Sequence, residues 1–122
     1  MTVIPNFILK KLYQAGSLTA LPEGIGFNII NNLGPGQISQ LNSITINEQV
    51  FLSDRILLKM DDKLIEGRSI TENNPATFFL NQVITCIIQG LTLPPGDYSI
   101  KLDLISREAG KVVLTVKDQL QA

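Results

Sequence analysis

The chain has 122 residues, of which 44% are apolar and 17% charged, with a net charge of −1, and this balance predicts one folded domain over residues 1–122. It carries no block of basic residues and no apolar run near the ~20 residues that cross a bilayer, which argues against nucleic-acid and membrane partners. The chain has no His and a single Cys, so it lacks the ligands of a zinc site and cannot form an intrachain disulfide. The N-terminus does not resemble a leader sequence, and we expect a cytoplasmic protein.

Apolar and polar residues alternate along most of the chain, and no window holds three turns of helical spacing, so strands are predicted throughout. A turn at residues 33–36 separates two of them, because two glycines flank a proline of fixed φ there. In the N-terminal half we expect strands at residues 7–13, 16–21, 26–32, 37–46 and 50–51.

The clearest element is an antiparallel hairpin over residues 98–117. Its turn at residues 107–110 ends in Gly110, which takes a positive φ without steric cost. Every second residue on both sides of the turn is expected to face the core, namely Tyr98, Ile100, Leu102, Leu104, Val112, Leu114 and Val116. Further strands are predicted at residues 55–60, 63–66 and 83–89, with a loop at residues 71–75.

Eight or nine short strands at this spacing predict an all-β fold, a two-sheet antiparallel β-sandwich. A small closed β-barrel is the alternative. Residues 93–98, Leu-Pro-Pro-Gly-Asp-Tyr, favour an immunoglobulin-like sandwich because they resemble a tyrosine corner. The Tyr98 hydroxyl should then bond to backbone between residues 91 and 94.

No group of residues predicts catalysis. Without His, the commonest general base and metal ligand is missing. Cys86 lies in the apolar run 83–88, which favours a small buried hydrophobe over a nucleophile. The glycines at residues 24–26 and 34–36 precede strands rather than the helix that a phosphate site needs. We therefore predict no catalytic, cofactor-binding or metal-binding residue, and no cofactor.

Several segments carry a resemblance to a known family. They are residues 4–13 with 16–18, residues 26–27, residues 32–36, and the stretches 95–98, 107–110 and 116–118 near the C-terminus. They are similar to a family of small archaeal and bacterial proteins of unassigned function, whose members often carry the label hydroxymethylglutaryl-CoA reductase. The resemblance implies no site residue, because the reductase of that name uses a catalytic His.

Two functions from different classes follow. The first is a non-catalytic binding or structural module that acts through a protein surface and self-associates. The alternative is a small enzyme, or an enzyme subunit, whose site is completed by another chain. A third possibility, an apolar ligand held between the sheets, would show as a cavity too large for its side chains.

The distribution of charge predicts where a partner binds. Residues 24–47 and 73–96 form two stretches of 24 residues without a charged side chain. Charge depletion with aromatic residues is typical of the core of an interface. The predicted contact of a homodimer, or with a protein partner, comprises Phe78, Phe79, Leu80 and Val83. The other interpretation is that these strands are central and covered on both sides.

Overall fold

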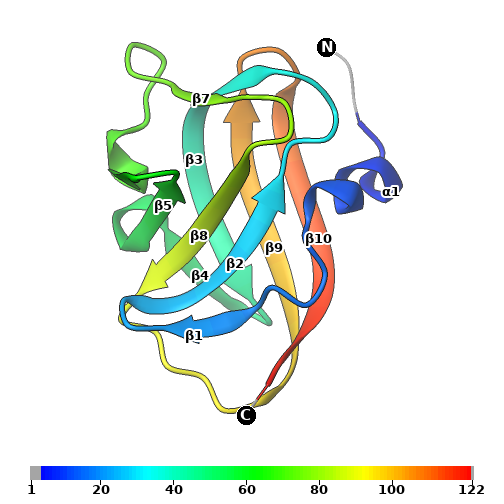
Figure 1. The fold of residues 1–122 in the computed structure, drawn as a ribbon, viewed down its shortest axis with the longest axis vertical. Helices are drawn as coiled ribbons and strands as arrows, with labels where there is room; N and C mark the ends of the chain where they lie inside the picture. The colour runs from blue at the N-terminus through cyan, green and yellow to red at the C-terminus, as the bar shows by residue number, and fades with distance from the viewer. Residues whose placement is uncertain (1–3, 122) are drawn as a thin grey trace.

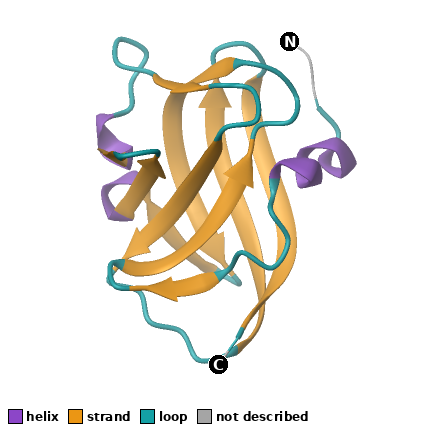
Figure 2. Ribbon diagram, in the orientation of Figure 1, coloured by secondary structure: helices purple, strands orange, loops and turns teal. Residues whose placement is uncertain are grey.

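The computed structural model describes residues 4–121, which form two antiparallel sheets packed face to face (Figures 1 and 2). One sheet has the order β1-β2-β8-β5-β6. The other has the order β10-β9-β3-β4, with β7 paired to the far end of β3. The strands are β1 (Thr19–Leu21), β2 (Gly24–Ile30), β3 (Gly36–Ile46), β4 (Gln49–Leu52), β5 (Ile56–Met60), β6 (Lys63–Glu66), β7 (Ala76–Phe78), β8 (Val83–Gln89), β9 (Gly96–Ser106) and β10 (Gly110–Leu120).

The all-β sandwich prediction is confirmed. Within residues 4–121 each sheet ends in two edge strands, β1 and β6 in the first and β10 and β4 in the second, so neither closes on itself. The alternative of a small closed barrel is therefore wrong. Ten strands are present among the described residues, slightly more than the eight or nine expected.

The hairpin of β9 and β10 has the predicted pairing. Leu102 lies opposite Leu114, and Leu104 lies opposite Val112. The two strands bury these side chains, together with Ile100 and Val116, in the core between the sheets. Period-two alternation decides which face is buried, because successive side chains of a strand point to opposite sides. Tyr98 is only half-buried and packs at the margin of this core.

The predicted tyrosine-corner hydrogen bond is present. The Tyr98 hydroxyl donates to the carbonyl oxygen of Pro94 at 2.5 Å. This contact fixes the entry into β9, while the immunoglobulin-like assignment as a whole stays a prediction.

Strand β8 is central in its sheet, between β2 and β5. Ile84, Cys86 and Ile88 point into the core, and Ile87 is buried on the opposite face. The interpretation of residues 83–88 as a covered strand therefore holds for most of it. Val83 at its beginning is the exception, with 41% of its surface exposed.

The strand predicted at residues 7–13 is wrong. Residues Asn6–Leu9 form the short helix α1, and Lys10–Leu12 form the 3₁₀ turn η1. Leu9, Leu12 and Tyr13 are spaced three and four apart, which places them on one face of a helical turn. One helical turn is too short to give a periodic pattern that differs from the alternation of a strand. Two more 3₁₀ turns are η2 (Ser53–Arg55) and η3 (Gly67–Ser69), and no described helix is long and apolar enough to span a membrane.

Candidate functional site

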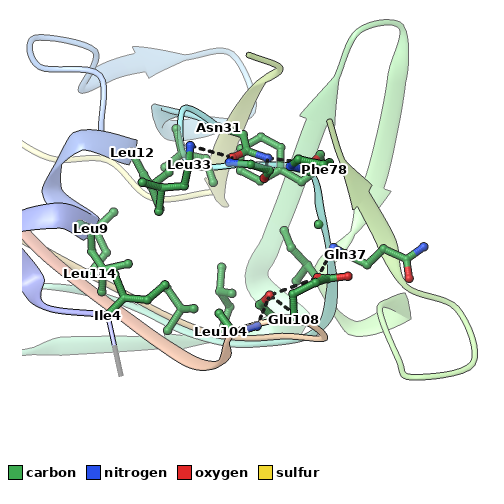
Figure 3. A pocket seen from close by; sticks show the side chains of 18 of the residues that line it. Ile4, Leu9, Leu12, Asn31, Leu33, Gln37, Phe78, Leu104, Glu108 and Leu114 are labelled. Carbon is green, nitrogen blue, oxygen red and sulfur yellow. Dashed lines mark hydrogen bonds between the residues drawn. The ribbon is translucent and has the colours of Figure 1, made fainter. Parts of the chain in front are cut away.

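An apolar cavity of about 250 Å³ lies between the two sheets, beside α1 and η1. In Figure 3 side chains from four directions surround an unfilled centre. The apolar wall includes Leu9 and Leu12 from the helical segment, Ile29 from β2, Phe78 from β7, Leu104 from β9 and Leu114 from β10. The cavity is thus built by both sheets and closed on one side by the N-terminal segment.

The N-terminal segment is held to both sheets by hydrogen bonds. The side-chain oxygen of Asn6 accepts from the backbone N–H of Thr115 in β10 at 3.3 Å. At the other side, Asn32 Nδ2, just beyond β2, donates to the carbonyl oxygen of Lys11 at 2.7 Å. Because these contacts reach opposite sheets, α1 and η1 form a fixed strap across the open side of the sandwich (Figure 1).

Asp118 of β10 holds the next part of this segment. Its Oδ2 accepts hydrogen bonds from the Tyr13 hydroxyl at 2.6 Å, from the N–H of Gly16 at 3.1 Å and from the N–H of Leu18 at 3.2 Å. Partial burial raises the pKa of Asp118, but the hydrogen bonds outweigh it, so the pKa lies below its ordinary value. Burial, followed by the bond to Asp118, raises the pKa of Tyr13. At neutral pH Tyr13 is therefore a neutral phenol that donates the hydrogen bond, and Asp118 is a carboxylate that accepts it.

Asn31 joins two turns at the cavity. Its Nδ2 donates to the carbonyl oxygens of Gly34 at 2.7 Å and Phe78 at 2.8 Å. Its Oδ1 accepts from the N–H groups of Leu33 and Gly34, and its backbone oxygen accepts from Asn81 N at 2.6 Å. The side chain is 4% exposed. The turn at 33–36 and the turn at 79–82 are therefore fixed relative to each other.

Our sequence analysis missed Asn31. A signal was available, because an Asn just before a Gly-Pro-Gly turn often uses its side chain to bond the turn's backbone. The contact with Phe78, 47 residues away, had no such local signal.

Glu108 is the one charged residue among the described residues that line the cavity. Its Oε1 accepts from the backbone N–H of Gln37 at 2.9 Å and lies 3.4 Å from the hydroxyl of Ser106. Figure 3 shows Glu108 at the lower margin, with the side chain of Gln37 directed away from the centre. The Gln37 N–H is the main cause that holds the pKa of Glu108 below its ordinary value. The exposed carboxylate is therefore anionic at neutral pH.

The four residues predicted at an interface divide into two groups. Phe78 is 9% exposed and lines the cavity, so its side chain belongs to the core rather than to an outer surface. Phe79, Leu80 and Val83 are 62%, 52% and 41% exposed. We call these three residues the rim patch, because Asn31 fixes their turn next to the cavity.

Residues 8–121 match the family described as hydroxymethylglutaryl-CoA reductase, N-terminal domain. The chain belongs to this family. The match includes residues 47–90, which carry little of the resemblance described above. It agrees with the reductase label of the proteins that both ends of the chain resemble. The family is one of non-catalytic N-terminal domains. No curated protein matches the chain.

In this member of the hydroxymethylglutaryl-CoA reductase N-terminal domain family, the single cysteine, Cys86, does not line the cavity. Cys86 is fully buried, and burial raises its pKa to about 12. In the described part of the chain, no group of three or more His, Cys, Asp or Glu side chains is arranged to hold a metal ion. The arrangement offers apolar contact and one exposed carboxylate.

Proposed function

We propose that the chain is a non-catalytic binding or structural domain that acts in the cytoplasm and self-associates through the rim patch. The observation that carries this proposal is the exposure of Phe79, Leu80 and Val83, three large apolar residues within five positions of the chain around one turn. Large apolar side chains grouped on a surface mark contact sites, because their burial against a partner removes them from water.

The rim patch is ordered before any partner binds. The N–H of Phe79 donates to Oε1 of Gln82 at 2.8 Å, and the N–H of Gln82 donates to the carbonyl oxygen of Phe79 at 3.0 Å. Asn81 adopts the left-handed conformation with φ of 66°, which Asn tolerates better than most residues. A fixed turn loses little conformational entropy on binding, which favours association.

Two other exposed apolar residues, each on an edge strand, lie among charges. Leu64, 55% exposed on edge strand β6, follows Lys63 and the acidic pair at 61–62. Val50, 57% exposed, lies on edge strand β4 near Glu48. The rim patch lies in the uncharged stretch 73–96. Charge next to an apolar residue opposes burial in an interface, so the rim patch is the better contact surface.

A second copy of the chain is the partner that fits this patch. A patch without charge pairs with itself around a two-fold axis without placing like charges together. The net charge of −1 adds little repulsion between copies. The rim patch alone is small, so the surrounding uncharged residues must contribute to the buried area of a stable dimer.

The family description favours one alternative, an enzyme subunit in which this surface packs against a catalytic chain. In that case the rim patch has the same exposed residues but a different occupant. A heteromeric complex on purification would support this alternative.

Sedimentation velocity at micromolar concentration tests self-association. We expect a dimer for the unmodified chain and a loss of affinity of roughly 30-fold or more for Phe79→Asp, which places a charge in the contact. Leu64→Asp is the matched control, since Leu64 is similarly exposed on a different strand. A monomer at all concentrations, or dissociation by Leu64→Asp and not by Phe79→Asp, would overturn the proposal.

A further inference from the structure

The cavity is open to solvent at its margin, and its accessible space measures about 250 Å³. Close packing leaves few spaces larger than a water molecule in protein interiors, so a pocket of this size beside the core has room for a ligand. An apolar cavity of about 150 Å³ binds benzene. By proportion this cavity accepts a molecule of roughly ten heavy atoms. It is smaller than the ~300 Å³ at which pockets for drug-sized ligands begin, so the ligand is small.

The interior of the cavity recognises only apolar groups. Its most buried polar residue, Asn31, has both polar side-chain atoms engaged in hydrogen bonds within the chain. The remaining wall is dominated by branched aliphatic side chains such as Ile29, Leu104 and Leu114. A polar or charged ligand group placed here would lose its hydration without a partner.

The margin of the cavity has the opposite character. Glu108 presents a carboxylate there, and only its Oε1 is engaged among residues 4–121. Its Oε2 is therefore available to accept a hydrogen bond from a ligand. No lysine or arginine lines the cavity in the described part of the chain. The charge at the margin favours a donor such as an ammonium or hydroxyl group and opposes a carboxylate.

We propose that this cavity is a binding site for a small amphiphile, with an aliphatic body of about eight carbons between the sheets and a hydrogen-bond-donating end at Glu108. The strap of α1 and η1 forms one wall through Leu9 and Leu12. Ligand binding therefore stabilises the strap against the sandwich. This site is separate from the self-association surface, because Phe79, Leu80 and Val83 do not line the cavity.

The test uses three eight-carbon compounds that differ in their polar end: octylammonium, 1-octanol and octanoate. Each is titrated into the full chain, the two ionic compounds below their micelle concentrations and 1-octanol below its solubility limit, with methyl NMR shifts as the measurement. We expect saturable shifts for Leu104 and Leu114, with octylammonium and 1-octanol at least 10-fold tighter than octanoate. No saturable shift with any compound, or tighter binding of octanoate, would overturn the proposal.

Two neighbouring valines of β10 supply a matched pair of variants. Val112 lines the cavity, whereas Val113 is on the other face of the strand. Val112→Phe should fill the space and weaken 1-octanol binding at least 10-fold, while Val113→Phe should leave it unchanged. Ala109→Leu fills the cavity from the turn and serves if Val112→Phe does not fold. Unchanged binding in a folded cavity-filling variant would show that the compound binds elsewhere.

Glu108→Gln separates the role of charge from that of shape. Glutamine keeps an oxygen that accepts from the N–H of Gln37, so the turn retains its hydrogen bond. The variant should bind 1-octanol within about threefold of the unmodified chain and lose most of the preference for octylammonium over octanoate. An unchanged preference would remove Glu108 from the site. Phe79→Asp should bind 1-octanol with unchanged affinity, because Phe79 does not line the cavity. This titration separates ligand binding from self-association.

Discussion

The hydroxyl of Tyr13 donates a 2.6 Å hydrogen bond to Oδ2 of Asp118, a residue 105 positions later in the chain. The Tyr13 ring also lies 5.6 Å from the ring of Phe27, measured between centroids. One tyrosine thus links the N-terminal strap, the core residue of β2 and the last strand of the other sheet. The contact anchors the residue that directly follows the strap.

Removal of the Tyr13 hydroxyl should lower the free energy of unfolding. Tyr13→Phe keeps the ring packing and deletes a hydrogen bond to a charged acceptor, a change that costs about 1.5–3 kcal/mol. Urea denaturation followed by circular dichroism measures it. Because Asp118 keeps its other donors, Gly16 and Leu18, the lower end of the range is expected. A change below about 0.5 kcal/mol would mean that the contact contributes little in solution.

The Asp118 contact should make stability dependent on acid. The folded state lowers the pKa of Asp118 below its ordinary value of 3.8. Its contribution is therefore fully present above that pH and is lost as the pH falls through the lower pKa of the folded state. The difference in urea midpoint between the unmodified chain and Asp118→Asn should be largest at neutral pH and shrink below pH 3.8. A difference that stays constant would show that Asp118 acts without its charge.

Tyr13 should have the complementary effect in alkali. Its pKa in the folded state is raised above the ordinary value of 10.0. Stability from this residue is thus present below pH 10.0 and lost as the pH rises from there toward the higher pKa of the folded state. Tyr13→Phe should show a smaller loss of stability than the unmodified chain in this range. Equal losses in both proteins would assign the alkaline effect to other groups.

Tyr98→Phe should destabilise the protein less than Tyr13→Phe. The Tyr98 hydroxyl donates to a neutral carbonyl, that of Pro94, and the residue is half-exposed. A neutral hydrogen bond contributes about 0.5–1.5 kcal/mol. Water replaces part of the bond in the variant, so we expect a value near the lower end in urea denaturation. A loss above about 2 kcal/mol would indicate that the corner is needed to fold the hairpin.

Truncation of a paired core leucine should have the largest effect. Leu114 is 2% exposed and lies opposite Leu102. Leu114→Ala should cost about 2–5 kcal/mol through lost burial and an enlarged cavity. Thr115→Ala on the exposed face of the same strand is the control and should change stability by less than about 0.5 kcal/mol. A loss below about 1 kcal/mol for Leu114→Ala would contradict its place in the core.

Much of the sandwich was predictable because strands produce a local pattern of apolar and polar residues in the sequence. The residues of β8 were predicted with the same bounds, 83–89, and the hairpin of β9 and β10 with the right face and turn. In both places alternation of side chains, or an apolar run between polar residues, follows directly from the geometry of a strand. The burial of Cys86 followed from the same run.

The strap shows where local pattern fails. Leu9, Leu12 and Tyr13 sit at helical spacing, but one turn of helix has too few residues to form a periodic signal. The segment becomes helical because Leu9 and Tyr13 pack in the core and because Asn6 and Lys11 bond to opposite sheets. Packing against distant strands, rather than intrinsic propensity, decides the structure of so short a segment.

The sequence by itself determined the all-β class, the main hairpin and the absence of a charge in two long stretches. Only the tertiary structure separated Phe78, which is buried, from Phe79, which is exposed, and only it revealed the cavity. The reason is physical. Alternation depends on neighbouring residues, whereas a cavity is space left among side chains from four stretches of the chain, residues 4–12, 29–38, 78 and 102–114. No local pattern in the sequence indicates a space that is not filled.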